Sequence, residues 1–278
     1  MLAKEKRISR IVLKPARRIY NYVKDYIYSL QNPDSMIPPK SANFVGGGDF
    51  DTVGQEFKQH FIELGGLQPN HRVLDVGSGI GRMAVPLTTY LTAEGSYCGI
   101  ELVSKGVKWC QRRITRRYPN FQFQQCDVFN KMYNPKGKYA ARNYKFPFDD
   151  GSFDFVLLTS VFTHMLPEDV KNYTKEVSRV LKPGGKCLIT FFIMNQESRT
   201  LVESGQSSRD FKYQLDGCYT IDMSIPEGAI AFDEAVVSEL FASHGLAITK
   251  PVQYGSWCGR SEFLSYQDII VAERQDFS

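Results

Sequence analysis

The stretch that decides the fold is R-V-L-D-V-G-S-G-I-G-R-M-A, which spans residues 72–84. Val73, Leu74 and Val76 form a short apolar run that is typical of a buried parallel strand. Three glycines follow within five residues, and a helix-like pattern begins at Arg82. A turn of this kind between a strand and a helix points backbone N–H groups at a ligand, because glycine lacks the Cβ that would hold the ligand away. The stretch therefore predicts a ligand site at the end of a parallel strand.

The spacing of the glycines distinguishes between possible classes of ligand. A dinucleotide fingerprint, G-x-G-x-x-G, would need a glycine where this chain has Arg82. Asp75 lies two residues before the first glycine, and a carboxylate there suits an ammonium group better than a pyrophosphate. The spacing D-x-G-x-G-x-G resembles the first motif of the class I S-adenosylmethionine (SAM) methyltransferases. An ordinary strand-to-helix turn is the alternative that this stretch alone leaves open.

Composition is that of an ordinary globular protein. The chain has 278 residues, of which 42% are hydrophobic and 23% charged, so one α/β domain with additions is the default. Neither a membrane-spanning apolar run nor a signal-peptide layout is present, and we expect a cytoplasmic protein. The cysteines have no regular spacing and do not pair with histidines as zinc ligands would, so we expect reduced thiols and no metal. They are Cys98, Cys110, Cys126, Cys187, Cys218 and Cys258.

The positive charge is concentrated at the N-terminus. Residues 1–30 contain eight Lys and Arg against two acidic residues, a net charge of +6, which leaves 4 − 6 = −2 for the rest of the chain. Apolar residues recur at nearly helical spacing over residues 4–30, with Pro15 as a break. Two interpretations stay open: the arm lies on an anionic membrane surface, which would make the protein peripherally membrane-associated, or it packs on the domain with its cations solvated.

We divide the chain into a basic helical arm with a proline-containing linker, residues 1–40, and a SAM-type domain, residues 41–278. The domain opens on S-A-N-F-V-G-G-G-D-F, residues 41–50, where Phe44 and Phe50 flank three consecutive glycines. This segment either presses aromatic side chains onto a ligand or is a flexible linker, and the sequence leaves both open.

Alternating strand and helix patterns predict a Rossmann-like α/β fold. The prediction is a seven-stranded, mostly parallel sheet with helices on both faces and an antiparallel last strand. The resemblance to class I methyltransferases covers roughly residues 55–273. The predicted strands are 72–76, 96–100, 121–125, 153–158, 186–192, 246–253 and 268–272. The predicted helices are 52–64, 82–91, 104–117, 167–180 and 233–244.

Two acidic residues follow later strands at positions that suit an adenosine. Glu101 ends the second strand, 20 positions after Gly81, where a carboxylate can accept from both ribose hydroxyls. Asp127 closes the third strand, and the resemblance implies that it accepts from the adenine amino group, although a turn or N-cap aspartate is the alternative. Leu102 and Val128 would sandwich the adenine ring.

Further markers of the family follow in order: D-G-S-F-D-F-V at residues 150–156, and V-L-K-P-G-G at residues 180–185. The resemblance implies SAM as cofactor and S-adenosylhomocysteine (SAH) as product. The cofactor-binding residues that it implies are Asp75, Gly77, Ser78, Gly79, Gly81, Arg82, Glu101, Leu102, Asp127, Val128 and Thr159.

His164 is the candidate catalytic residue. A sulfonium methyl group is already activated, so the enzyme mainly aligns the nucleophile, but an alcohol also needs a base. His164 follows the fourth strand, where ligands gather in open α/β sheets, and imidazole titrates near neutral pH. The alternative is a histidine that packs beside the cofactor.

Additions to the domain would select the acceptor. Residues 193–232 are an insertion where this family often builds a lid. Arginines beside aromatic residues suit an acidic, phosphorylated or sugar-like acceptor, whereas the alternative is that these loops merely cover the core. The candidate acceptor-binding residues are Phe44, Phe50, Arg199, Arg209, Tyr213, Trp257 and Arg260.

The sequence thus predicts methyl transfer to a small-molecule, glycan or lipid-linked acceptor, at oxygen, with N- or C-methylation as alternatives. Base-modifying amino methyltransferases carry N/D-P-P-Y/F/W after the fourth strand, where this chain reads L-T-S-V-F, and we expect no DNA partner. The basic arm keeps RNA methylation open. A non-catalytic SAM-binding scaffold is the remaining alternative.

Overall fold

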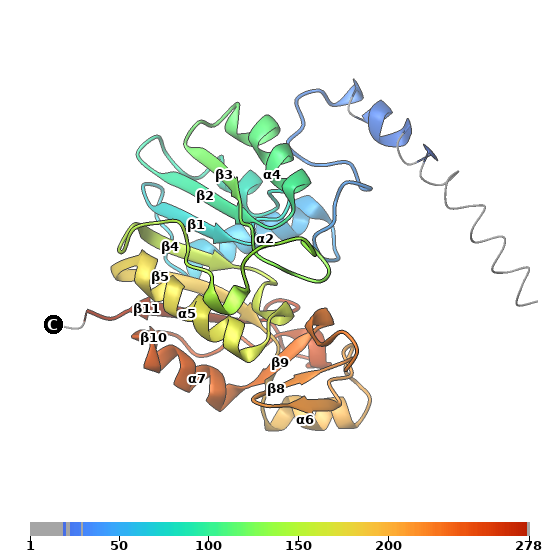
Figure 1. The fold of residues 1–278 in the computed structure, drawn as a ribbon, viewed down its shortest axis with the longest axis vertical. Coiled ribbons are helices and arrows are strands. Elements are labelled where there is room, and N and C mark those ends of the chain that lie inside the picture. Colours follow the sequence, from blue (N-terminus) through green and yellow to red (C-terminus); the bar gives the residue numbers. More distant parts are fainter. Residues whose placement is uncertain (1–18, 21–22, 29, 277–278) are drawn as a thin grey trace, which may run out of the picture.

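The structure is a computed structural model that describes residues 19–20, 23–28 and 30–276 (Figure 1). The predicted amphipathic arm, residues 4–30, falls largely outside the described residues, so its membrane contact stays a prediction. Among the helices that the structure describes, none is long and apolar enough to cross a membrane.

A seven-stranded sheet forms the central layer, in the order β10-β11-β5-β4-β1-β2-β3. Strands β1 to β5 pair in parallel, and β11 runs antiparallel to both of its neighbours. The predicted sheet with an antiparallel last strand is confirmed. The strands are β1 (Arg72–Val76), β2 (Ser96–Glu101), β3 (Phe121–Gln125), β4 (Phe153–Leu158), β5 (Leu181–Phe191), β10 (Leu246–Ile248) and β11 (Asp268–Arg274).

Helices cover both faces of this sheet (Figure 1). Because side chains alternate along a strand, Val73 and Leu74 of β1 point into different cores. Leu74 shares its core with α5 and α7, and Val73 with α2 and α4. The main helices are α2 (Phe50–Glu63), α3 (Ala84–Leu87), α4 (Ser104–Cys110), which continues as the π-helix η1 (Gln111–Thr115), α5 (Pro167–Val180) and α7 (Glu234–Ser243).

Three elements differ in length from their predictions. The helix expected over residues 82–91 is reduced to α3, because the hydroxyls of Thr88 and Thr89 bond back to carbonyls three residues earlier and compete with helix continuation. Strand β10 stops at Ile248, ahead of Pro251, which has no N–H for the ladder. The expected turn at residues 183–185 lies inside β5, where the register with β4 shifts.

The insertion at residues 193–232 builds a second, four-stranded sheet, in the order β6-β9-β8-β7, at the lower right of Figure 1. The sequence predicted the insertion but not these strands, which are only two to four residues long. Phe192, Phe211 and Trp257 pack ring against ring beneath the sheet. The elements are β6 (Ile193–Met194), α6 (Gln196–Glu203), β7 (Tyr213–Leu215), β8 (Cys218–Thr220), the 3-10 turn η4 (Pro226–Gly228) and β9 (Ile230–Asp233).

Residues 33–39 pack against the domain instead of forming the free linker that their prolines suggested. Trp109 Nε1 of α4 donates a hydrogen bond to the Met36 carbonyl at 3.3 Å, and Arg113 of η1 donates to the Pro33 carbonyl. Pro38 and Pro39 are buried. The packed unit therefore begins before residue 41.

Candidate functional site

A cavity of about 830 Å³ opens at the carboxyl ends of β1, β2 and β4. This is where ligands bind in open α/β sheets, since loops diverge there. The predicted site residues on its wall are Phe44, Gly77, Ser78, Arg82, Glu101, Leu102, Val128, Thr159, His164 and Arg209.

The glycine turn after β1 has the left-handed backbone that its sequence predicts. Gly77 and Gly79 have φ values of 84° and 57°. The N–H groups of Gly77 and Ser78 donate to the Ile100 carbonyl at 2.8 and 3.1 Å, which joins the turn to the end of β2. A Cβ on Gly79 would lie 2.3 Å from a methyl carbon of Val45, so only glycine permits this close approach.

Glu101 and Ser78 line the cavity and have hydrogen-bond donors or acceptors that are still free. The Glu101 carboxylate accepts from the Gly79 and Val103 N–H groups at 2.8 and 2.7 Å, which fixes its orientation and leaves lone pairs free. Burial raises its pKa, and those hydrogen bonds oppose the rise. The Ser78 hydroxyl is buried without a partner among the described residues. A ligand with hydroxyl and amino groups, as in SAM, fits these donors and acceptors.

Four of the predicted cofactor-binding residues do not line the cavity: Asp75, Gly79, Gly81 and Asp127. Gly79 and Gly81 belong to the glycine turn itself. Asp75 is fully buried and accepts from the Tyr97 hydroxyl, and burial raises its pKa to about 7. Asp127 is exposed, and its carboxylate accepts from the Lys138 N–H at 3.2 Å. Direct ligand contact by these four residues stays a prediction.

The segment 44–48 lies across the glycine turn as a short lid. The Arg82 guanidinium donates to the carbonyls of Val45, Gly46 and Gly47, the last two at 3.3 and 3.2 Å. Phe44 lines the cavity and has Lys105 Nζ 4.8 Å from its ring centroid. Phe50 is the first residue of α2 and does not line the cavity. Its side chain is buried, and the Arg82 Cζ atom lies 5.9 Å from its ring centroid.

His164 projects onto the cavity wall from the 3-10 turn η3 (Phe162–His164) that follows β4. Its Nδ1 lies 2.9 Å from the Glu227 carbonyl oxygen. Because a carbonyl can only accept, Nδ1 carries the proton and Nε2 keeps its lone pair. Burial lowers the pKa of the imidazole, and the nearby Arg209 charge lowers it further. The imidazole of His164 is therefore neutral at neutral pH, with its proton on Nδ1.

The wall around His164 combines apolar side chains with cations. Arg209 Nε donates to the Tyr266 hydroxyl at 3.1 Å, and Lys131 Nζ donates to the Ser224 carbonyl at 3.4 Å. Burial raises the pKa of Asp169, the acid beside Arg142. This half of the cavity suits an acceptor with both an apolar body and a polar group. Its apolar residues include Phe129, Tyr133, Met165, Tyr173 and Phe192.

Four predicted acceptor residues lie away from the cavity wall. Arg199 pairs with Asp233 and donates to the Tyr219 hydroxyl at 2.9 Å, and Tyr213 is exposed on β7. Trp257 and Arg260 are buried, because both serve a polar network instead of a surface. None of the four lines the cavity, and acceptor contact by them stays a prediction.

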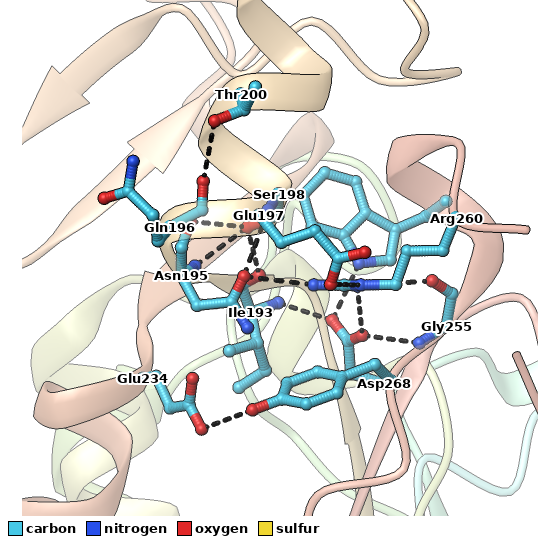
Figure 2. A network of polar contacts seen from close by, with 12 residues as sticks. Ile193, Asn195, Gln196, Glu197, Ser198, Thr200, Glu234, Gly255, Arg260 and Asp268 are labelled. Carbon is cyan, nitrogen blue, oxygen red and sulfur yellow. Dashed lines mark hydrogen bonds and ion pairs between the residues drawn. The ribbon is translucent and has the colours of Figure 1, made fainter. Parts of the chain in front are cut away.

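Figure 2 shows that network, which is centred on Asp268 at the start of β11. One Asp268 oxygen accepts from Trp257 Nε1 at 2.7 Å and from the Ile193 N–H at 2.6 Å. The other accepts from the Gly255 N–H at 2.6 Å and lies 3.4 Å from Arg260, whose Nε donates to Glu197 at 2.8 Å. The network fastens the inserted sheet and the loop 253–267 to the central sheet.

Sequence reasoning missed the wall residues next to this network. Ser265, Tyr266 and Gln267 line the cavity, and the Gln267 side-chain oxygen accepts from Ser160 and Thr190 at 2.9 and 2.7 Å. The available signal was Asp268, a charged residue at the start of the apolar run D-I-I-V-A. A carboxylate buried there needs several hydrogen-bond donors, which neighbouring loops must supply.

The sheet order, the glycine turn after β1 and the carboxylate at the end of β2 are the features that the sequence predicted for a class I SAM-dependent methyltransferase. Residues 74–189 match the family described as "Methyltransferase domain". This part of the chain, less than half of its length, therefore resembles a SAM-dependent methyltransferase domain.

Curated relatives match part of this chain. A phthiotriol/phenolphthiotriol dimycocerosates methyltransferase of Mycobacterium tuberculosis is 36% identical over 124 residues, which cover 45% of this chain and 37% of the relative. The tRNA N(3)-cytidine methyltransferase METTL2 of Gallus gallus is 28% identical over 172 residues, or 59% of this chain and 42% of the relative. The chain thus spans less than half the length of these relatives.

Solved structures share the fold. The PH0226 protein of Pyrococcus horikoshii OT3 superposes with a TM-score of 0.58 at 18% identity, covering 84% of this chain and 95% of that one. Magnesium protoporphyrin IX methyltransferase of Synechocystis PCC 6803, with bound SAH, gives 0.52 at 16% identity, covering 85% and 92%.

Proposed function

We propose that this chain is an enzyme that transfers the methyl group of SAM to a hydroxyl oxygen of a small, lipid-like acceptor, with His164 as general base. The observation that carries the proposal is the fixed tautomer of His164: the Glu227 carbonyl holds Nδ1–H and leaves Nε2 as the basic atom of a ring on the cavity wall.

Glu101, Ser78 and the backbone of the glycine turn would hold the cofactor, since they carry the free hydrogen-bonding capacity of that half of the cavity. When bound, SAM supplies a methyl group that is already activated by its sulfonium. Leu102 and Val128 line the same half and offer apolar surfaces to an aromatic ring.

The acceptor hydroxyl must lose its proton as its oxygen becomes methylated. His164 Nε2 accepts this proton, and the Glu227 carbonyl stabilises the resulting imidazolium through Nδ1–H. The lowered pKa keeps Nε2 unprotonated before the reaction and returns the proton readily to water afterwards.

The acceptor class follows from the other half of the cavity. Phe129, Met165 and Phe192 offer apolar contact, and Arg209 places its guanidinium beside them. This combination suits an amphiphile with a polar head. The mycobacterial relative is named for methylating a phthiotriol lipid, which supports a lipid-like acceptor. RNA is the second candidate, supported by the tRNA cytidine methyltransferase relative.

The test is transfer of labelled methyl from SAM to a lipid extract and, separately, to tRNA. We expect labelled lipid and unlabelled tRNA. His164→Gln should lower kcat by about 10²-fold or more with SAH affinity retained, because a general base contributes 10²- to 10⁴-fold. His244→Gln, at the end of α7, is the matched control and should be near-normal. Labelled tRNA, or a His164→Gln enzyme of normal turnover, would contradict the proposal.

A further inference from the structure

Exposed apolar side chains of the domain gather in three loops. Between residues 31 and 276 the structure exposes eleven large apolar side chains, and nine of them lie in residues 129–139, 222–228 and 263–266, here called the rim. The two others, Tyr213 and Val236, lie elsewhere. Soluble proteins rarely expose large contiguous apolar patches without a partner, so the clustering of nine of these side chains in three loops needs an explanation. The nine are Phe129, Met132, Tyr133, Tyr139, Met223, Ile225, Phe263, Leu264 and Tyr266.

All three rim loops border the same cavity. Phe129 and Tyr133 line it from the first loop, Glu227 and Gly228 from the second, and Tyr266 from the third. The hydrogen bond from Lys131 Nζ to the Ser224 carbonyl at 3.4 Å joins the first loop to the second. The loops that carry the exposed apolar side chains therefore border the cavity.

The first rim loop belongs to a basic, aromatic segment. Between Asp127 and Asp149 the chain carries five cations and no acidic residue. Lys138 Nζ lies 5.3 Å from the Tyr139 ring centroid, an arrangement in which the aliphatic stem packs and the ammonium stays in water. Cations with exposed aromatic residues suit the headgroup layer of an anionic membrane.

We propose that the rim docks on an anionic membrane surface, with its apolar side chains at the boundary between headgroups and acyl chains. The acceptor then enters the cavity directly from the bilayer, a step that rests on the proposed function. Nucleic acid fits the rim less well, because exposed apolar side chains such as Met223 and Phe263 gain nothing from a phosphate backbone, whereas they can enter the boundary between headgroups and acyl chains.

The test measures binding of the full chain to vesicles of phosphatidylcholine containing about one third phosphatidylglycerol. The rim variant is Met132→Ser/Met223→Ser/Phe263→Ser, whose three residues are exposed and do not line the cavity. The matched control is Tyr213→Ser/Val236→Ser. We expect the rim variant to lose about tenfold or more in partition coefficient, and the control to stay within about twofold.

Hydrogen exchange of the full chain on the same vesicles separates the rim from the N-terminal arm. Protection in residues 129–139, 222–228 and 263–266 is expected. Protection confined to residues 1–30, equal losses in the rim variant and the control, or rim-dependent binding of tRNA with no vesicle binding would each overturn the proposal. SAH binding measured alongside tests the proposed function separately, since both variants leave the cofactor half of the cavity intact.

Discussion

Asp75 shows that a residue can be found from its sequence motif while its hydrogen-bond partner in the fold cannot. Its position two residues before the first glycine marks the motif correctly, but the side chain points into the core and accepts from the Tyr97 hydroxyl. Both faces of the sheet are buried at β1, so the strand pattern alone does not say on which face the Asp75 side chain lies. One sequence does not state this.

The raised pKa of Asp75 makes stability depend on pH. Its pKa is about 7 in the folded chain against an ordinary 3.8, so between these values the folded state holds a proton that the unfolded state has lost. Its contribution to stability is therefore greatest at low pH and is lost as pH rises through 7. The free energy of unfolding of Asp75→Asn, taken relative to the parent, should therefore increase by on the order of 2 kcal/mol as the pH is raised from 5 to 8.

Urea unfolding at the two pH values measures this difference. Asp216→Asn, at an exposed turn, is the control and should track the parent at both pH values. A difference between Asp75→Asn and the parent that does not change with pH would contradict the assignment.

At the scale of the element, the inserted sheet depends on its contacts with the rest of the domain, among which the Asp268 network is the polar anchor. Strands β6 to β9 are too short to be stable alone, and they join the domain through the Asp268 network and the Phe192 ring cluster. The insertion was predictable as extra chain between a strand and a helix. Its anchor was not, because Ile193 and Asp268 are 75 positions apart.

Removing that anchor should be costly. Asp268→Ala leaves the buried Arg260 guanidinium without its buried partner and orphans the Trp257 and Ile193 donors. We expect a loss of about 3–5 kcal/mol in the free energy of unfolding, measured by urea denaturation. The control is Asp210→Ala, which breaks an exposed pair with Lys212 and should cost less than about 1 kcal/mol. Equal effects of the two changes would show that the network is not an anchor.

At the scale of the whole molecule, the cavity is assembled from segments across the chain. The glycine turn supplies one side, the lid at residues 44–48 closes over it, and the loops at 129–142, 227–229 and 265–267 form the rest. A ligand that contacts so many segments binds the folded state alone and should stabilise it.

We expect SAH at about 100 times its dissociation constant to stabilise the chain by about 2.7 kcal/mol, seen as a rise in the melting temperature. Glu101→Gln should reduce this rise, because an amide presents one acceptor and one donor where the ribose hydroxyls meet a carboxylate. The dinucleotide NAD should give no rise. A shift with NAD and none with SAH would contradict the cofactor assignment.

The sequence by itself determined the central sheet, the glycine turn with Glu101, and the candidate base His164, because each depends on patterns within about 20 to 30 neighbouring residues. Only the tertiary structure decided that Arg82 donates to the carbonyls of Val45–Gly47, that Trp257 and Arg260 contact Asp268 away from the cavity wall, and that three loops with exposed apolar side chains border one cavity. The lid contacts of Arg82 join residues 35 to 37 positions apart, and the Lys131–Ser224 contact joins residues 93 positions apart. Trp257 and Arg260 lie only 11 and 8 positions from Asp268, but the fold of the loop between them decides which way their side chains point. Their partners are chosen by packing of the whole sheet, which no local pattern encodes.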